Sequence, residues 1–237
     1  MNIKIAHLYY DLMNLYGESG NIKVLDYYLR SQGIKVTIDK LSIDDKIDFT
    51  KYDLFYIGSG TENNQKIVLN DLFKYKKDIQ KALKVNKFFL ITGNALEMFG
   101  KSIDDISCLD IFNFETTYSE KRKASESIFH FGELNLDLLG FQNQFGSMKF
   151  LDEPLFEVKQ GIGSGNTESS HEGVRVNNFY GTYLLGPILA RNPEFTVYFV
   201  SKLINSINKD FSFKGFNIKL DNDAYNKYMS VKYAKNE

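Results

Sequence analysis

Short runs of apolar residues alternate with helical patterns throughout the first hundred residues of this chain. Near-continuous apolar runs are typical of strands buried on both faces, and the intervening helical segments supply the crossovers that parallel strands require. The pattern therefore predicts an α/β fold of three α/β/α layers with a mostly parallel central sheet. The predicted strands are residues 3–9, 35–39, 52–57 and 87–92, and the predicted helices are residues 21–32 and 62–83.

The pattern changes after Cys108. Residues 108–156 carry shorter and less periodic strand signals, and the glycine- and serine-rich residues 161–172 predict an exposed loop. Strand character returns in the block that follows, an amphipathic helix begins after Asn192-Pro193, and the tail forms a polar helix. No repeat or linker divides the chain, so we expect one domain over residues 1–237. The last three segments span residues 174–184, 194–207 and 221–237.

The composition excludes several classes of function. The 29 Lys and Arg residues balance 30 Asp and Glu residues, and a formal net charge of −1 gives no electrostatic basis for binding nucleic acid or an anionic membrane surface. A single cysteine, Cys108, excludes an internal disulfide and a multi-cysteine metal site. The first residues lack the features of a signal peptide, and no apolar run is long enough for a membrane span. We therefore expect a soluble, cytoplasmic protein without a metal site or a cofactor.

The turn Gly58-Ser59-Gly60 is a candidate functional position, because function in open parallel sheets gathers where strands end and helices begin. Its small residues leave backbone N–H groups free to hold an anion or an oxyanion. A plain tight turn is the alternative interpretation, and this segment taken alone favours it.

A second turn follows the apolar strand at residues 87–92 and begins with Gly93-Asn94-Ala95. A strand, a sharp turn of small residues and a helix form the geometry of a nucleophile elbow, in which a reactive side chain sits on a strained backbone. Here Gly93 occupies the apex, where it has no side chain to react and accepts a positive φ without strain. An ordinary strand–helix turn is the alternative.

Several segments, taken in order, resemble those of the class I, triad-type glutamine amidotransferases. The resemblance is closest to the cobyric acid synthase-like branch, which contains the glutaminase subunit of lipid II isoglutaminyl synthase. It rests on the order and spacing of the segments and covers most of the chain. They are HLYYDLMNLYG at 7–17 with GNI at 20–22, GSGTENNQ at 58–65, GNALEMFG at 93–100, GFQNQ at 140–144, EGVR at 172–175 and FYGTYLLGP at 179–187.

The resemblance implies a flavodoxin-like fold and a chemistry that this chain has lost. In that chemistry a thiolate attacks the glutamine carboxamide, a histidine activates the thiol and protonates the departing ammonia, and backbone amides stabilise the oxyanion. The nucleophile position falls on Gly93 and the histidine position on Leu185, so both are degenerate. The implied oxyanion or ligand pocket consists of Gly58, Ser59, Gly60, Asn94 and Gln65, and the implied substrate-binding position of Gln144 and Ser147.

No other residue is predicted to replace the missing groups. Cys108 is expected in a buried strand, where a lone cysteine is usually inert. His7 is expected to have a satisfied structural role inside the first strand, His130 alternates with aromatic residues, and His171 lies in the predicted loop. Loss of the nucleophile alone costs a factor of about 10⁶ in the protease case, so we expect no glutaminase activity.

Two functions follow as hypotheses. The first is a non-catalytic subunit or paralogue, which the resemblance implies would dock as a heterodimer on a Mur-ligase-like synthetase that amidates the D-glutamate of bacterial peptidoglycan. The second is a small-molecule binding or sensing protein that uses the degenerate pocket. That pocket is expected to be larger and more apolar than its ancestor, with Glu62 and Glu97 at its rim. A different enzyme on the same scaffold ranks lowest, because no clustered Ser/His/Asp or metal-ligand spacing occurs.

Overall fold

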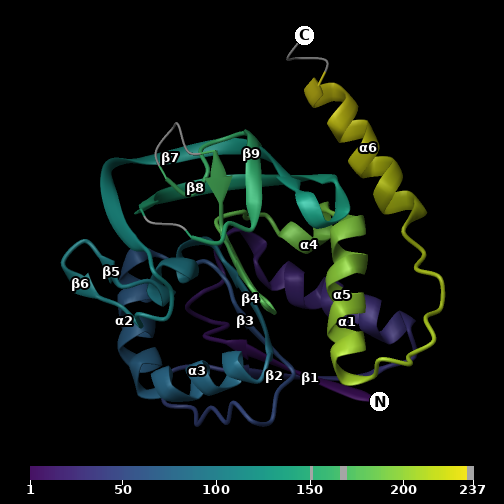
Figure 1. The fold of residues 1–237 in the computed structure, drawn as a ribbon, viewed down its shortest axis with the longest axis horizontal. Coiled ribbons are helices and arrows are strands. Elements are labelled where there is room, and N and C mark those ends of the chain that lie inside the picture. The colour runs from purple at the N-terminus through teal and green to yellow at the C-terminus, as the bar shows by residue number, and fades with distance from the viewer. Residues whose placement is uncertain (150–151, 166–169, 234–237) are drawn as a thin grey trace.

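A six-stranded sheet lies at the centre of the fold, with the strand order β11-β12-β4-β3-β1-β2 (Figure 1). The computed structural model describes residues 1–149, 152–165 and 170–233. Five neighbouring strands of this sheet are parallel, and only β11 runs antiparallel to its neighbour. The predicted parallel sheet is therefore confirmed. Its strands are β1 (Asn2–Leu8), β2 (Lys35–Leu41), β3 (Leu54–Ile57), β4 (Phe88–Thr92), β11 (Val174–Val176) and β12 (Phe179–Thr182).

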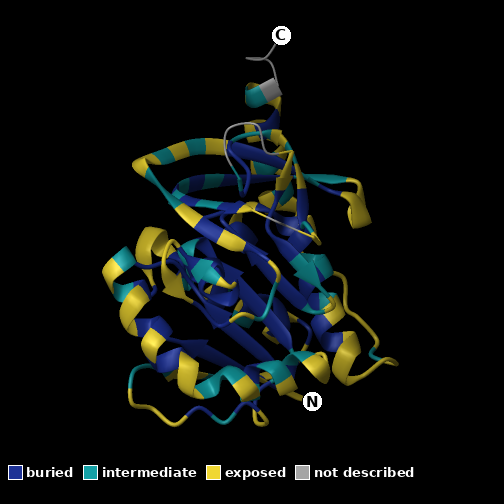
Figure 2. Ribbon diagram, turned by 60° about the vertical axis from the view of Figure 1, so that its left-hand side comes forward, coloured by how far each residue is buried: buried dark blue, intermediate teal, exposed yellow. Residues whose placement is uncertain are grey.

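Helices cover both faces of this sheet, because successive strand residues point to opposite faces and both sets are apolar. In β3, Leu54 packs into the core beneath α1 and α5, whereas Phe55 packs into the core beneath α2 and α3. Figure 2 shows the buried sheet between helices whose outer surfaces are exposed. The three-layer α/β/α fold is thus confirmed. The helices are α1 (Ser19–Ser31), α4 (Ile188–Arg191) and α5 (Pro193–Ile207) on one face, and α2 (Glu62–Leu72) and α3 (Lys76–Lys84) on the other.

A second sheet stands above the carboxyl end of the first (Figure 1). Its main part is a long antiparallel pair, β7 (Glu115–Phe131) and β8 (Leu136–Lys149), joined through the short 3₁₀ helix η4 (Gly132–Leu134). The expectation of short strands here was wrong. The middle of β7 is polar and exposed on both faces, so alternation does not reveal it. Pairing with β8 on either side of a register shift between Tyr118 and Lys123 holds the strand extended. The other strands are β5 (Ser102–Ile103), β6 (Ile106–Ser107), β9 (Phe156–Gln160) and β10 (His171–Glu172).

Two further expectations need correction. The single helix predicted over residues 62–83 is interrupted by the 3₁₀ turn η2 (Phe73–Tyr75), where the Tyr75 hydroxyl donates to the Asp45 carbonyl oxygen at 2.9 Å. The segment 161–172, predicted as an exposed loop, includes Ser164 and Glu172, which are buried. Ser164 Oγ accepts the Gly173 N–H at 2.7 Å, so hydrogen bonds rather than apolar contacts hold this polar segment inward. Residues 166–169 of that segment lie outside the described residues.

The chain ends in the helix α6 (Lys219–Tyr233), which crosses to the second sheet (Figure 1). Met229 packs against Ile128 and Leu139, and the Tyr225 hydroxyl donates to the Asp137 carbonyl oxygen. The predicted polar helix is confirmed as far as residue 233, and residues 234–237 lie outside the described residues. Across the part of the chain that the structure describes, no helix has the length and apolar character of a membrane span.

Candidate functional site

Gly93 lies at the apex of the turn from β4 into the 3₁₀ helix η3 (Gly93–Phe99), with a φ of +63°. A Cβ atom at this position would lie 2.5 Å from both Cβ and Oγ of Ser59 and 2.8 Å from Leu185 Cδ2. The structure therefore brings together three residues that are far apart in the sequence. It also shows that the space beside Gly93 is filled by Ser59 and Leu185, and the expected enlargement of the pocket at this point was wrong.

The Asn94 side chain occupies the glycine-rich turn that follows β3. Its Oδ1 accepts the Gly60 N–H at 3.0 Å and the Ser59 hydroxyl at 3.2 Å, and its Nδ2 donates to the Gly60 carbonyl oxygen at 3.0 Å. The Gly60 amide, a natural donor to an oxyanion, is thus already engaged by a neutral amide from the same molecule. Gly58 serves packing, since a Cβ there would come within 2.6 Å of the Met13 carbonyl oxygen.

Glu97 is buried inside η3 and accepts hydrogen bonds from three side chains. Gln65 Nε2 donates to it at 2.7 Å, the Tyr183 hydroxyl at 2.8 Å and the Tyr118 hydroxyl at 3.2 Å. Burial raises the pKa of Glu97 to about 7, although these hydrogen bonds act in the opposite direction. The expectation of Glu97 at a solvated rim was wrong, because η3 is a buried 3₁₀ helix rather than a surface helix. Glu62 is half-buried and pairs with Arg122.

Glu18 is a second buried carboxyl group, and it joins the two segments that meet at Gly93. It accepts from Thr92 Oγ1, which precedes Gly93, and from the Gly186 N–H at 3.4 Å, which follows Leu185. The Tyr56 hydroxyl also donates to it at 3.0 Å. Burial raises the pKa of Glu18 to about 7. Nothing local in the sequence distinguishes Glu18, because its hydrogen-bond donors come from segments distant in the chain.

Glu172 is a third buried carboxyl group, in β10. It accepts the Thr182 hydroxyl at 2.7 Å and the Tyr183 N–H at 2.6 Å, and burial raises its pKa to about 7. These contacts fix the segment between β12 and Leu185. The sequence pointed to Glu172 only as part of the EGVR segment.

The sequence of this chain was compared with known protein families and with curated proteins. The family of CobB/CobQ-like glutamine amidotransferase domains matches residues 4–193, which is most of the chain. The chain belongs to this family. Its relatives include GatD, a subunit of lipid II isoglutaminyl synthase (glutamine-hydrolyzing), from Streptococcus pneumoniae, at 30% identity over 97% of this chain and 92% of the relative. GatD from Staphylococcus aureus is 28% identical over 94% of this chain and 91% of its own.

A further relative agrees with the family, and a solved structure agrees with the fold. A probable cobyric acid synthase from Methanococcus vannielii is 27% identical over 60% of this chain and 32% of its own length. The PurLQS structure from Thermotoga maritima has a TM-score of 0.58 at 11% identity, over 90% of this chain and 100% of that one. The resemblance to class I glutamine amidotransferases is confirmed by the family match, and the PurLQS structure supports the fold.

Gln144 and Ser147, where the family resemblance implied a substrate-binding position, lie in β8. The buried Gln144 side chain donates to the carbonyl oxygens of Gly146 and Gly163, both at 3.1 Å, and so holds the glycine-rich segment after β9 against β8. Ser147 is half-buried and lies opposite Thr117 in the β7–β8 ladder. Leu185 is tied to β8 at Phe141, whose carbonyl oxygen accepts the Leu185 N–H at 2.8 Å.

The β7–β8 pair is fastened across the glycine-rich turn by contacts that the sequence did not reveal. The Arg122 guanidinium pairs with Glu62 at the start of α2, donates to the Asn143 carbonyl oxygen at 3.0 Å and lies 4.2 Å from the Phe145 ring centroid. On the other side, Asn143 Nδ2 donates to the Tyr16 hydroxyl at 2.7 Å. The second sheet is therefore bonded both to the start of α2, through Glu62, and to the segment before α1, through Tyr16.

The remaining candidate residues do not form a second centre. Cys108 is buried just after β6 rather than in a strand, and burial raises its pKa to about 12, which keeps the thiol protonated. His130 Nδ1 lies 2.8 Å from Asp137 Oδ1, and His171 is exposed in β10. His7 is buried, but its Nε2 has no hydrogen-bond partner, so the expected satisfied role was wrong. Among the described residues, no group of His, Cys, Asp or Glu is arranged to hold a metal ion.

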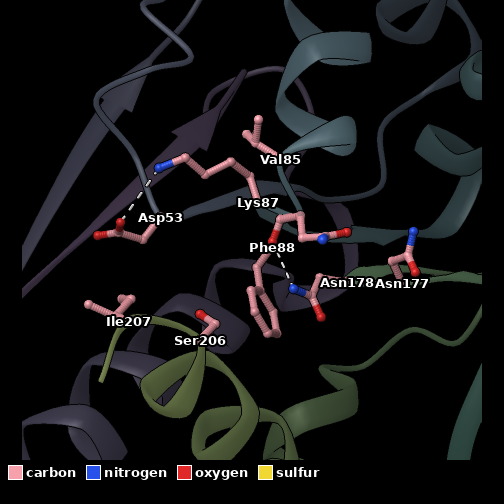
Figure 3. Close-up of a pocket in the computed structure, with 9 residues that line it drawn as sticks. Asp53, Val85, Lys87, Phe88, Asn177, Asn178, Ser206 and Ile207 are labelled. Carbon is pink, nitrogen blue, oxygen red and sulfur yellow. Dashed lines mark hydrogen bonds and ion pairs between the residues drawn. The ribbon is translucent and has the colours of Figure 1, made fainter. Parts of the chain in front are cut away.

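A cavity of about 550 Å³ lies at the opposite end of the main sheet, as Figure 3 shows. Asp53 and Lys87, which approach to 3.7 Å, precede the strands β3 and β4, and Asn178 precedes β12. Because these residues stand at the amino ends of parallel strands, the cavity is remote from Gly93 at the carboxyl end. Its polar groups are largely paired with one another; Asn178 Nδ2, for example, donates to the Asn86 carbonyl oxygen at 2.7 Å.

Replacing Gly93 by alanine is expected to lower the free energy of unfolding by about 2–4 kcal/mol, since the change adds both positive-φ strain and a clash with Ser59. Gly17→Ala is the matched control: its φ is +76° and no atom lies within 4 Å of the added Cβ, so it carries the conformational cost alone, about 1 kcal/mol. Adding Ser59→Gly should recover part of the Gly93 loss. Urea unfolding measures all three. Equal losses for Gly93→Ala and Gly17→Ala would show that Ser59 does not fill the space.

Proposed function

We propose that this chain is a non-catalytic member of its family that acts as a subunit of a Mur-ligase-like synthetase. The observation that carries the proposal is the packing at the elbow: Gly93 and Leu185 lie side by side where the family's nucleophile and histidine are expected, and Ser59 fills the space beside Gly93. A thiolate and a base are both missing there, and attack on a carboxamide needs both. The Gly60 amide is also occupied by Asn94.

The partner is inferred from the relatives. The two GatD proteins are subunits of lipid II isoglutaminyl synthase, and this chain matches more than nine-tenths of each. In the proposed role, the synthetase activates the D-glutamate carboxylate of the peptidoglycan stem and free ammonia supplies the nitrogen. This chain then holds the synthetase in its active conformation and does not supply ammonia. That role is consistent with a fold that retains the glycine-rich turn and the elbow but lacks the reactive groups.

The substrate-binding positions follow the same proposal. Gln144 is committed to the carbonyl oxygens of Gly146 and Gly163, and Ser147 offers only a hydroxyl. Neither supplies the positive charge with which a site would hold the carboxylate of glutamine. The sensing hypothesis, which needs an enlarged pocket at Gly93, loses its support because Ser59 and Leu185 fill that space.

The proposal is tested by co-expression of this chain with a Mur-ligase-like synthetase from the same organism. We expect the two to co-purify, and we expect the complex to amidate lipid II with ammonium chloride but not with glutamine. The synthetase alone should amidate more slowly. A Mur-ligase-like synthetase that neither binds this chain nor gains activity from it would overturn the proposed role.

A further inference from the structure

The strand β2 forms an open edge of the main sheet. Among the described residues, which are 1–149, 152–165 and 170–233, β2 pairs with β1 alone. At the opposite edge, by contrast, the Arg175 N–H of β11 donates to the Glu153 carbonyl oxygen at 2.9 Å. An edge strand presents a row of backbone N–H and C=O groups that can pair with a strand of another chain. β2 is therefore the edge at which the main sheet can be extended.

The ladder with β1 determines which residues of β2 face outward. The Lys35 N–H donates to the Met1 carbonyl oxygen at 3.2 Å, and the Leu41 carbonyl oxygen accepts the Tyr9 N–H. The backbone groups of successive residues in a strand point to opposite sides, so the odd-numbered residues of β2 face β1. The even-numbered residues face outward, and these are Val36, Ile38 and Lys40.

The outward backbone groups are available to a second strand. Arg30 Nη2 donates to the Val36 carbonyl oxygen at 3.0 Å, but the Arg30 side chain is 53% exposed and a carbonyl oxygen has two lone pairs. Val36 can therefore accept a second donor. In the part of the chain that the structure describes, no residue bonds to the outward N–H and C=O groups of Ile38 and Lys40. All three outward positions can thus pair with an incoming strand.

The charges of β2 complement each other when two copies of the strand pair antiparallel. With a two-fold axis at Thr37, Val36 lies opposite Ile38 of the second copy, and both residues face the partner strand. The same register places Lys35 of each copy opposite Asp39 of the other. Both side chains are exposed, and they point to the same face of the sheet because they are an even number of residues apart. Opposite charges on directly opposed residues stabilise a strand pair.

Other registers of this pairing lack the complementarity. An axis at Asp39 would place the two Asp39 side chains opposite each other, and like charges in this position destabilise a sheet. An axis at Ile38 would place Lys35 opposite Leu41 and Asp39 opposite Thr37, so no opposite charges would meet. The charge pattern therefore selects the register centred on Thr37, and it favours a second copy of this chain as the incoming strand.

We propose that this chain forms a homodimer in which the β2 strands of two copies pair antiparallel about Thr37, with Lys35 of each copy beside Asp39 of the other. The two main sheets then join into one continuous sheet. The strands β1 and β3 lie between this edge and β4, which leads to the elbow at Gly93. The dimer needs neither glutamine chemistry nor a synthetase, so its test does not depend on the function proposed above.

The first test measures the mass of the full chain by sedimentation equilibrium at loading concentrations from about 5 to about 500 µM. We expect a monomer–dimer equilibrium with a Kd below about 100 µM. A single species of 27.3 kDa over the whole range would overturn the proposal.

Charge reversal then identifies the interface. Lys35→Glu places two carboxylates opposite each other at each end of the strand pair, and Asp39→Lys places two ammonium groups there. Each variant should therefore self-associate at least about tenfold more weakly than the wild type. An equimolar mixture of the two variants should associate again, because opposite charges then meet at both positions. The double variant Lys35→Glu/Asp39→Lys should also dimerise, for the same reason.

Lys40→Glu is the matched control, since Lys40 is also an exposed lysine of β2 but lies opposite the uncharged Ile34 in this register. We expect it to change the Kd less than about twofold. Asp39→Lys also removes the acceptor of the Tyr52 hydroxyl, 2.9 Å from Asp39 Oδ2, so circular dichroism checks that each variant is folded. A dimer that both single variants form as tightly as the wild type would place the interface elsewhere and overturn the proposal. A mixture that associates no better than either variant alone would contradict the register.

Discussion

Replacing Glu97 by leucine is expected to lower the free energy of unfolding by about 3 kcal/mol or more. The change leaves the Tyr183 hydroxyl buried without its acceptor, and it removes one acceptor each from Gln65 and Tyr118. Unsatisfied buried donors cost about 1–3 kcal/mol each, and leucine cannot replace the carboxyl oxygens. Urea unfolding followed by circular dichroism measures the loss.

Glu97→Gln is the matched control, because glutamine has nearly the same shape and retains one acceptor oxygen. We expect it to cost less than about 1.5 kcal/mol. A leucine variant as stable as the glutamine variant would show that the hydrogen bonds to Glu97 contribute nothing to stability.

The free energy of unfolding is expected to fall as the pH rises from 5 to 8. Burial raises the pKa of Glu18, Glu97 and Glu172 from 4.5 to about 7, so the folded state holds protons that the unfolded chain releases. Their stabilisation is fully present below about pH 4.5 and is lost as the pH rises through about 7. Each group contributes about 3 kcal/mol at most. His7 opposes one of them, because its lowered pKa makes stability rise between about pH 4 and 6.5.

The net fall across this pH range is therefore expected to be about 3 kcal/mol or more. Urea unfolding at pH 5.5, 6.5, 7.5 and 8 measures it, and the Glu97→Gln variant should show a smaller fall, since it lacks one of the three titrating groups. A stability that is flat or rises between pH 6.5 and 8 would contradict the burial of these carboxyl groups in their observed form.

The main sheet could be predicted because its signal is local. Segments such as Phe88–Thr92 are short, almost entirely apolar and followed by small residues, and this pattern is typical of a parallel sheet buried on both faces. The second sheet could not be predicted in the same way. The polar stretch in β7 has no apolar alternation, and its extended form depends on pairing with β8 on both sides of a register shift between Tyr118 and Lys123.

In the candidate site, too, the residues with a local sequence signal could be predicted and those that depend on distant contacts could not. Residue types and spacing indicated Gly93 and Leu185, and in the structure Leu185 Cδ2 lies 2.8 Å from where a Cβ of residue 93 would be. The buried carboxyl groups were missed because nothing local distinguishes Glu97 or Glu18 from a surface glutamate. Their burial depends on donors from distant segments, such as Thr92 at the end of β4 and Tyr183 just after β12. Asn94 was expected as part of a pocket, but only the structure shows its side chain closing the turn at Gly60.

This chain is expected not to hydrolyse glutamine, and glutamate release from glutamine measures this most directly. The purified chain is assayed alone and with the Mur-ligase-like synthetase, beside GatD from Streptococcus pneumoniae as the reference. We expect no glutamate above the buffer rate in either condition. Clear turnover by the chain, alone or in the complex, would contradict the account, because it would require a nucleophile other than the one missing at Gly93.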